Sequence, residues 1–483
     1  MSSINNFLNS ITMYRLVLYG LTLLALVGIV LGFLGLLPYN GVSLLLSALI
    51  LLAACYVSNF IFAKILRVSV NVESVYITAF ILFLIMPPPE NLTMAWALIL
   101  AGVIAMASKY LLAPMRKHIF NPAAFGAGAV FLLGLSGASW WIGSSVMFPT
   151  ALIVGLLVVK KIRRFDLFLA FLVAAAASII YFAGSADTYQ VLKISLLSGP
   201  LIFFGIIMLT EPATTPPTRK FRILYGILIG ALFNFYPTPE ITLLLGNILS
   251  YAFGFKRKLI LTLVEKNDVA SGIKEFIFSP DKKFSFKPGQ YLEWTLPHAN
   301  PDTRGNRRYF TVASSPTEEN IKLGVKLNKP SSSFKEKLQS MQVGEKATAG
   351  GLDGDFVLPR DKNKKLVFLA GGIGITPFRS IIKYLTDKGE RRNITLFYSV
   401  KSEDEIAYRY LFIEAEAKVG LKTEYVVEKF LDESAVREKV PDWKERVFYI
   451  SGPEAMVNAF KKMLLKMGVS RRNIVTDYFP GFA

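Results

Sequence analysis

Residues 307–316, Arg-Arg-Tyr-Phe-Thr-Val-Ala-Ser-Ser-Pro, place a guanidinium, an aromatic ring and hydroxyl groups close together. The Arg308 guanidinium can pair with a phosphate. The Phe310 ring can cover one face of a flat heterocycle, and the hydroxyls of Thr311 and Ser314 can hydrogen-bond its polar edge. The alternative is an ordinary edge strand with a basic start. The stretch is therefore a candidate site for a phosphate-bearing, flat cofactor.

A glycine-rich segment further along the chain suits a dinucleotide. Leu366–Ala370 has the pattern of a buried strand, and residues 371–377, Gly-Gly-Ile-Gly-Ile-Thr-Pro, follow it and open a predicted helix from Phe378. Glycines let the backbone approach a pyrophosphate, and a helix start favours its negative charge. From Lys365 onward, strands alternate with helices, which predicts a parallel sheet.

Two further groups of residues extend this candidate surface. Ser332 and Ser333 precede a predicted helix, where hydroxyl and N–H groups could hold a pyrophosphate. Ser399 and Lys401 lie at the end of the next strand of the parallel sheet. A hydroxyl and a cation there could hold a 2′-phosphate, but a solvated strand end explains them equally well. The sequence therefore leaves NADH and NADPH both open.

Residues 256–483 resemble ferredoxin-NADP reductase-like enzymes, because these segments occur in that family's order. Arg308, Phe310, Thr311 and Ser314 fill its flavin-strand pattern of Arg, any residue, aromatic, Ser or Thr, two residues, Ser. Residues 449–457 match its Cys-Gly-Pro-x-x-Met block, with serine in place of cysteine. The resemblance implies an antiparallel β-barrel that binds FAD at residues 256–360. It also implies an α/β domain with a parallel sheet that binds NAD(P)H at residues 361–483.

The same resemblance assigns roles to individual residues. We expect Thr311 near flavin N5, Ser451 beside the nicotinamide, and Phe482 stacked on the flavin until nicotinamide displaces it; these are the predicted catalytic residues. A hydrophobic tail on the sheet is the alternative for Phe482. The predicted FAD-binding residues are Arg308, Tyr309, Phe310, Thr311, Val312, Ser314, Ser332 and Ser333. The predicted NAD(P)H-binding residues are Gly371, Gly372, Gly374, Thr376, Pro377, Ser399, Lys401, Gly452, Pro453 and Met456.

Residues 1–255 are mostly apolar and raise the mean hydropathy of the 483-residue chain to +0.44. We predict about ten transmembrane helices there. Lys and Arg collect in alternate connections, so the positive-inside rule places both termini in the cytoplasm of a prokaryotic cell. These basic loops also explain much of the net charge of +19 without a nucleic-acid partner. The predicted spans lie near residues 14–37, 42–63, 73–87, 92–108, 121–135, 142–159, 165–183, 194–210, 221–236 and 240–254.

The apolar half also predicts two inverted repeats. Residues 80–90 echo residues 204–212, and an odd number of predicted spans separates the two copies. Each copy has short spans that begin or end at proline, which points to a polar site near the membrane midplane. Asn121-Pro122 and Thr238-Pro239 suit helix starts whose N–H groups could hold an anion or a flavin edge. Plain caps on tilted helices are the alternative.

Cysteine and histidine counts exclude several redox centres. The single cysteine, Cys55, cannot supply the four ligands of a typical iron–sulfur cluster. The two histidines, His118 and His298, lie in different halves of the chain, which argues against a haem held by stacked histidine pairs. The first apolar run, Tyr14–Leu37, is too long for a cleavable signal.

Most of residues 60–254 resemble the RnfD/NqrB family, the membrane flavin subunits of the Rnf complex and of the sodium-pumping NADH:quinone reductase. The match includes Lys117–Ala123 and Met208–Thr214, where Glu211 replaces the family's Asp. The resemblance implies a second flavin, FMN or riboflavin, in the membrane domain. The family's covalent-FMN motif is reduced here to Ser136–Ser139, for which a turn of small residues is the favoured interpretation. Glu211 is a candidate for cation or proton coupling, with a loop residue as the alternative.

Together these features predict a multi-domain membrane NAD(P)H oxidoreductase. Electrons would pass from cytoplasmic NAD(P)H through FAD to a flavin or quinone in an α-helical domain embedded in the lipid bilayer of the prokaryotic cytoplasmic membrane. Partners would include other redox subunits or a second copy of the chain. The alternatives are an inverted-repeat solute or ion transporter, or a redox-driven Na⁺ or H⁺ pump, powered or regulated by the reductase module.

Overall fold

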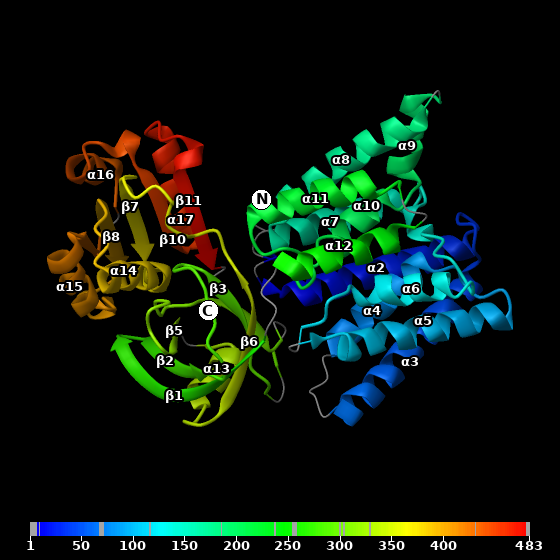
Figure 1. Ribbon diagram of the computed structural model, residues 1–483, viewed down its shortest axis with the longest axis horizontal. Helices are drawn as coiled ribbons and strands as arrows, with labels where there is room; N and C mark the ends of the chain where they lie inside the picture. The colour runs from blue at the N-terminus through cyan, green and yellow to red at the C-terminus, as the bar shows by residue number, and fades with distance from the viewer. Residues whose placement is uncertain are drawn as a thin grey trace. The chain divides into compact units, whose positions relative to one another are not determined.

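The computed structural model forms two compact units, Met1–Arg257 and Lys258–Ala483, which are described separately (Figure 1). The predicted boundary after residue 360, between the FAD and NAD(P) domains, stays a prediction. The structure describes residues 7–8, 10–66, 72–114, 117–184, 186–235, 238–253, 258–298, 301–302, 305–327, 330–429 and 431–479.

The N-terminal unit is helical. Its described helices are α2 Met13–Phe33, α3 Gly41–Leu66, α4 Val72–Ile85, α5 Leu92–Leu111, α6 Pro122–Leu132, α7 Phe148–Ile162, α8 Phe165–Ala183, α9 Thr188–Leu197, α10 Leu201–Phe203, α11 Arg219–Leu232 and α12 Pro239–Phe253.

Four of the helices within the described ranges, α2, α3, α5 and α8, are long and apolar enough to cross a membrane. A fifth span results if α9 and Leu201–Met208 count as one, although they meet at a bend of 60°. Ten transmembrane helices are therefore not confirmed. The prediction relied on hydropathy, but α4 and α6 have only 14 and 11 residues, whereas about 20 are needed to cross the hydrocarbon core.

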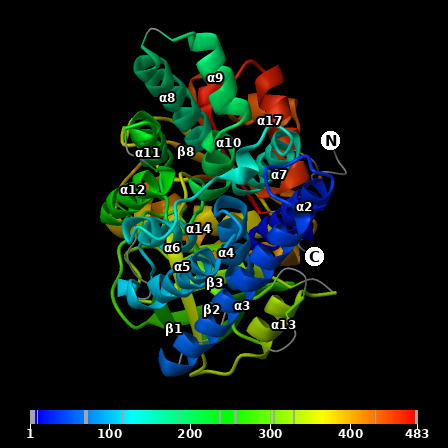
Figure 2. The same cartoon turned by 90° about the vertical axis from the view of Figure 1, so that its right-hand side faces the viewer.

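Small residues let the helices of this unit pack closely. A Cβ added at Gly126 of α6 would lie 2.3 Å from the carbonyl oxygen of Ala101 in α5. A Cβ added at Gly230 of α11 would lie 2.5 Å from the carbonyl oxygen of Phe171 in α8, and Figures 1 and 2 both show α11 beside α8. Such close backbone approach is typical of helices that associate in lipid.

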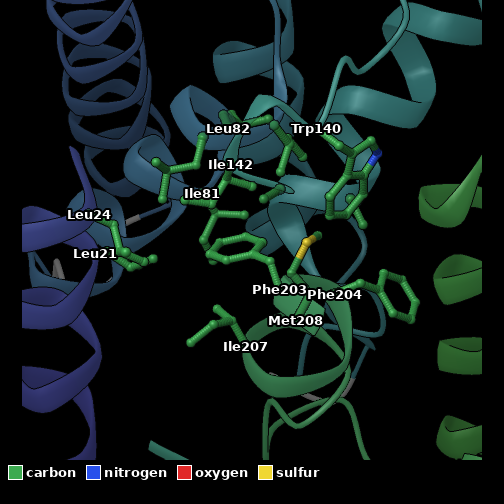
Figure 3. Packing of buried hydrophobic residues seen from close by; sticks show 14 of the residues in the cluster. Leu21, Leu24, Ile81, Leu82, Trp140, Ile142, Phe203, Phe204, Ile207 and Met208 are labelled. Carbon is green, nitrogen blue, oxygen red and sulfur yellow. The ribbon is translucent and has the colours of Figure 1, made fainter. Parts of the chain in front are cut away.

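Large apolar side chains fill the centre of the N-terminal unit. Figure 3 shows Phe203 and Met208 grouped with Ile81, Leu82 and Trp140, all of them buried. Residues 204–208, which continue α10, form a wide π-helical turn that is closed by a hydrogen bond from the Leu209 N–H to the Phe204 carbonyl at 2.9 Å. Turns of this kind occur frequently at functional sites.

The short helices α6 and α12 start as the sequence predicts, at Pro122 and Pro239. Asn121 caps α6, because its side chain accepts a hydrogen bond from the Ala124 N–H at 3.0 Å. Residue 121 lies beside Asn247 near the end of α12, and residue 128 lies beside residues 240–244 near its start. These corresponding helices of the two predicted copies therefore run antiparallel, which supports an inverted repeat.

The first half of the C-terminal unit is an antiparallel sheet of six strands in the order β4-β3-β6-β1-β2-β5. Its two edges meet at one end, where the Ala313 N–H donates to the Lys322 carbonyl at 2.9 Å. The sheet is thus a half-barrel, which confirms the antiparallel part of the prediction. The strands are β1 Leu259–Ala270, β2 Ile273–Pro280, β3 Tyr291–Thr295, β4 Arg307–Thr311, β5 Ile321–Lys326 and β6 Lys346–Asp353, and helix α13 is Ser333–Ser340.

The second half is a parallel sheet in the order β11-β10-β7-β8-β9, as predicted. Alternate residues of its central strand face opposite cores: Phe368 packs with α14 and α15, and Leu369 packs with α16 and α17. Helices therefore cover both faces of the sheet. The elements are β7 Leu366–Gly371, α14 Thr376–Lys388, β8 Ile394–Val400, α15 Arg409–Val419, β9 Lys422–Val427, α16 Glu433–Lys439, β10 Val447–Pro453, α17 Glu454–Lys466 and β11 Ile474–Phe479.

Candidate functional site

The predicted flavin strand is β4, and its side chains gather on helix α13. The Arg308 guanidinium lies 5.4 Å from the centre of the Phe334 ring, and the Phe310 ring lies 5.7 Å from it. Arg308 is 9% exposed, so its charge is fixed in a largely dry environment. Tyr309 points to the other face, where its hydroxyl donates to Glu293 at 3.2 Å. The strand's alternation therefore separates Arg308 and Phe310 from Tyr309.

The donors of this cluster already bind an anionic group. Arg308 donates to the Asp302 carboxylate at 3.3 Å. The Ser333 N–H, at the start of α13, donates to the other oxygen of the same carboxylate at 3.1 Å. Asp302 is thus held by a guanidinium and a helix N-terminus, the two kinds of donor that bind phosphate. Arg308 and Ser333 therefore fit the pyrophosphate of FAD, and Asp302 competes for the same donors.

The other predicted flavin-binding residues differ in whether their side chains already have a hydrogen-bond partner in the protein. The Thr311 hydroxyl is buried and has no hydrogen-bond partner within the described ranges, so it suits a polar edge of a ligand. Ser314 is engaged in the sheet, because its hydroxyl accepts from the Lys322 N–H at 3.1 Å. The Val312 N–H donates to the Gln290 carbonyl at 3.0 Å. Ser332 caps α13 by accepting from the Lys335 N–H at 3.4 Å.

The glycine-rich turn lies at the carboxyl end of the parallel sheet, where ligands bind in open α/β sheets. β7 ends at Gly371, and α14 begins with Thr376 and Pro377. A Cβ at Gly371 would lie 2.1 Å from the Met456 sulfur, and one at Gly374 would lie 2.3 Å from the Ser451 carbonyl oxygen. No other residue type fits at Gly371 or Gly374 without movement of the backbone or of Met456.

The remaining predicted dinucleotide residues surround this turn. Gly452 also lies against Met456, since an added Cβ would be 2.5 Å from its methyl carbon. Ser399 pairs with Gly371 in the parallel register, whereas Lys401 is exposed just beyond β8. Gly372 has a φ of +51° and open space around it, and Pro453 is exposed. The structure therefore brings the predicted NAD(P)H residues together at the carboxyl end of the sheet.

Ser451 lies inside the sheet. It sits on β10 between Ala370 of β7 and Asp477 of β11, is 0% exposed, and its hydroxyl has no hydrogen-bond partner in the part of the chain that the structure describes. A buried hydroxyl without a hydrogen-bond partner costs folding free energy. A cysteine thiol in the same position would cost less, because it behaves as a small apolar group. The third predicted catalytic residue, Phe482, lies outside the described residues.

Sequence reasoning missed a buried ion-pair network beside these two sites. Arg379 of α14 forms a two-pronged pair with Glu318, whose second partner is Lys322 at 3.1 Å. Burial alone would raise the pKa of Glu318, but hydrogen bonding and attraction from Arg379 outweigh it and lower the pKa to about 2. An arginine on the buried face of a helix that otherwise packs through apolar residues was the available signal.

The N-terminal unit holds a second polar cluster, at the start of α6. The Asn121 amide donates to Glu211 at 2.9 Å, and the Thr214 hydroxyl donates to the same oxygen at 3.1 Å. His118 lies 3.9 Å from the other oxygen of Glu211. The Asn121 N–H donates to the Asn247 side chain at 2.8 Å. Asn121 and Asn247, which come from the two predicted repeats, are therefore in contact. The Glu211 side chain is 29% exposed and lies at the edge of this cluster.

The turn at Ser136–Ser139 contacts helix α4, and a buried acid, Glu240, lies beside the residue that follows the turn. The Ser139 and Trp140 N–H groups both donate to the Ile85 carbonyl, at 2.8 and 2.9 Å, which ties the turn to α4. Glu240, the second residue of α12, is 1% exposed and lies beside Trp140. Glu240 was not among the residues predicted from the sequence, although a buried acid in an apolar unit is a functional candidate.

Comparison with known protein families finds a match within each half of the chain. Residues 131–236 match the model of the NQR2, RnfD, RnfE family. Residues 368–462 match the oxidoreductase NAD-binding domain. The family match and the long apolar helices identify the N-terminal unit as part of a membrane-integral protein.

Curated relatives and solved structures match the C-terminal half. A flavohemoprotein from Oceanobacillus iheyensis is 25% identical over 237 residues, which are 45% of this chain and 58% of that protein. The human oxidoreductase NAD-binding domain-containing protein 1 is 28% identical over 228 residues, 40% of this chain and 70% of that protein. The crystal structure of the Amycolatopsis cytochrome P450 reductase GcoB is 24% identical, has a TM-score of 0.42, and is matched over 46% of this chain and 70% of its own.

The chain thus spans less than two thirds of the length of the flavohemoprotein named above. The two family matches lie in different units of the structure, so the chain is a fusion. It joins a segment that matches the NQR2, RnfD, RnfE family to one that matches the oxidoreductase NAD-binding domain in a single polypeptide.

Proposed function

We propose that the protein is a membrane-bound NAD(P)H oxidoreductase. Electrons enter at the C-terminal unit from NAD(P)H, pass through FAD and leave through the membrane unit to a flavin, such as FMN or riboflavin, or to a quinone. The observation that carries this proposal is the glycine-lined turn of Gly371, Gly374 and Gly452 in the same compact unit as the Arg308–Ser333 anion site. The two family matches support it, and they favour it over a solute transporter.

The residues of the chain have separate tasks in this proposal. FAD, when bound, supplies the chemistry of accepting a hydride and releasing electrons. Arg308 and the Ser333 N–H hold its pyrophosphate, and Phe310 covers part of its surface. Thr311 presents a buried hydroxyl to a polar edge of the ring. The glycines at residues 371–374 let the backbone approach the pyrophosphate of the dinucleotide closely. Thr376 and Pro377 start the helix whose N-terminus favours the negative charge of that pyrophosphate.

Orientation and location are also proposed. Both termini face the cytoplasm of a prokaryotic cell, since the basic residues collect in alternate connections of the N-terminal unit. NAD(P)H is then available to the C-terminal unit. Lys401 and Ser399 could accept a 2′-phosphate, and comparing NADH with NADPH as reductants decides whether they do. Other redox subunits or a second copy of the chain complete the path in the membrane.

A flavin inventory tests the proposal. The full-length protein is purified in detergent, its flavins are released with acid and identified, and any protein-bound remainder is measured after proteolysis. We expect FAD in a one-to-one ratio to the chain, and a second flavin if the membrane unit carries one. Purified, folded protein that contains no FAD and does not bind added FAD would contradict the proposal.

Asp302 provides a test of the anion site that needs no activity measurement. FAD must displace its carboxylate from Arg308 and Ser333, so Asp302→Asn is expected to raise the affinity for FAD by about tenfold. Isothermal titration of flavin-free, full-length protein with FAD measures this. Asp268→Asn is the control, because it removes the same charge from an exposed pair with Lys274. Weaker FAD binding by Asp302→Asn would show that Asp302 organises the site instead.

A further inference from the structure

Helix α14 is attached to the segment that follows the flavin strand by several side chains. Arg379 donates to the Ala313 carbonyl at 3.1 Å and pairs with both oxygens of Glu318. Its neighbour Ser380 donates to the Ser314 carbonyl at 2.6 Å. In the last turn of the helix, Asp387 accepts from the Thr317 hydroxyl. We call these three side chains of α14, together with residues 313–318, the α14 clamp.

The part of the α14 clamp around Arg379 and Ser380 is buried and closely packed. Arg379 and Ser380 are 6% and 0% exposed. The Arg379 guanidinium lies 5.6 Å from the centre of the Tyr408 ring. Nearby, a Cβ added at Gly324 of β5 would lie 2.8 Å from the Thr376 methyl group. The antiparallel sheet therefore meets the start of α14 with no space for an additional side chain.

Charge around Arg379 is balanced. Arg379 and Lys322 face Glu318 and Glu275, with Lys322 lying 3.1 Å from the first carboxylate and 3.7 Å from the second. A buried guanidinium with two matched acceptors is rigid, and removing one partner of such a pair leaves an uncompensated charge. The pKa of Glu318, about 2, keeps the pair charged at neutral pH. Because this pKa is lowered, the pair's contribution to stability is lost only as the pH falls below about 4.5 towards 2.

The position of the α14 clamp has a consequence for the reaction. Residues 313 and 314 directly follow Thr311 and Val312 of the flavin segment. Arg379 lies three residues after Thr376, which opens the helix at the dinucleotide turn. One rigid contact therefore joins the backbone that carries the flavin site to the helix that carries the nicotinamide nucleotide. Hydride transfer depends on this separation, since an error of about 1 Å in position can cost about 100-fold in rate.

We propose that Arg379 is a positioning residue, which sets the separation of the two cofactors through Glu318 and Ala313. This proposal rests on the proposed function, but it assigns a role to a residue that contacts neither cofactor. Arg379 acts on the rate of hydride transfer and much less on the affinity for either ligand. Lysine in its place keeps the charge but cannot engage both Glu318 oxygens and the Ala313 carbonyl together.

Rapid-mixing measurements on the full-length protein loaded with FAD test the proposal. Arg379→Met is expected to slow flavin reduction at saturating NADH by about 100-fold, while the dissociation constant for NADH changes by less than about threefold. The flavin-reduction rate of Arg379→Lys is expected to lie between those of the unmodified protein and Arg379→Met. A primary isotope effect with 4-deuterated NADH should be larger in Arg379→Met than in the unmodified protein, since the hydride step then limits the rate.

Arg446→Met is the matched control. Arg446 is another buried arginine with a two-pronged carboxylate partner, Asp442, but it lies at the opposite end of the parallel sheet and contacts Leu366, the first residue of β7. We expect it to lower the melting temperature without slowing flavin reduction. If Arg379→Met does not fold, Glu318→Gln carries the same prediction, because it keeps the shape of the pair and removes its charge.

Three negative results have different meanings. Equal reduction rates in the unmodified protein and in the Arg379 or Glu318 variant, at equal FAD loading, would overturn the role of the α14 clamp. A slowed rate in Arg446→Met of the same size would also overturn it, since loss of stability alone would then explain the effect. No reduction by NADH or NADPH in the unmodified protein would instead contradict the proposed function.

Discussion

Replacing Gly374 with alanine is expected to lower the rate of flavin reduction by NAD(P)H by about 100-fold. The added Cβ would lie 2.3 Å from the Ser451 carbonyl oxygen and 2.6 Å from the Gly452 Cα. Neither atom belongs to a flexible side chain, so the backbone of the turn must move away from β10. The turn would then no longer let the pyrophosphate approach closely. Rapid-mixing kinetics over a range of NADH and NADPH concentrations measure both affinity and rate.

Gly389→Ala is the matched control for this substitution. It lies at the end of α14 away from the dinucleotide turn, where a Cβ meets no atom within 4 Å, and only its φ of +61° opposes the change. We expect it to cost about 1 kcal/mol of stability, with a rate within about threefold of the unmodified protein. The FAD content of both variants should be unchanged, since neither residue contacts the Arg308 site. If Gly374→Ala reduced its flavin at the normal rate and affinity, the dinucleotide would not bind at this turn.

Arg308→Ala is expected to weaken FAD binding by about 100-fold, so that the purified protein is largely colourless. The estimate follows from the loss of charge-assisted hydrogen bonds to a phosphate, each worth about 1.5–3 kcal/mol. Arg308 is 9% exposed and rests over Phe334, so the substitution removes a donor that is already held in place. Titration with FAD and the flavin-to-protein ratio after purification measure the change.

Arg307→Ala tests whether position or charge matters in that prediction. Arg307 is the preceding residue of β4, and its side chain lies 3.9 Å from Glu293 on the neighbouring strand. Since alternate residues of a strand face opposite sides, its removal should leave FAD binding within about threefold of normal. Equal losses in both variants would mean that Arg308 acts through general charge and not through a phosphate contact.

The parts of the site that lie within one strand–turn–helix unit could be predicted from the sequence. The turn at Gly371–Gly374 and the helix start at Thr376 are set by local residue types, and the structure places them at the end of β7 as expected. The caps of α6 and the proline starts of α6 and α12 are equally local. In each case the backbone chemistry of a few neighbouring residues decides the conformation.

Contacts between distant segments could not be predicted in the same way. Arg379 meets Glu318 across 61 positions, and Asp302 meets Ser333 across 31. Nothing in the local pattern of either acid indicates its partner, because each pairing depends on how segments that are distant in the sequence pack together. Ser314 also has a partner in a separate strand, β5. Its hydroxyl was predicted to face the cofactor, but it accepts a hydrogen bond from the Lys322 N–H in the sheet; its role in binding stays a prediction.

Hydropathy also predicted more membrane spans than the lengths of the described helices confirm. The apolar runs that contain α4 and α6 have the composition of spans, but the helices end after 14 and 11 residues. Pro87 follows α4, and the turn from Gly134 follows α6. Proline and glycine end helices for steric reasons that a hydropathy average does not include. Short helices of this kind, paired antiparallel as α6 and α12 are, suit a polar site inside the bilayer better than a simple span.

An anaerobic titration tests the central claim most directly. The full-length protein, purified in detergent and loaded with FAD, receives NADH or NADPH in steps while its visible flavin absorbance is recorded. The predicted result is bleaching that reaches completion at one equivalent of reductant per FAD, with further equivalents consumed if the membrane unit holds a second flavin. An absorbance that stays unchanged with both reductants, in protein shown to contain FAD, would contradict the account.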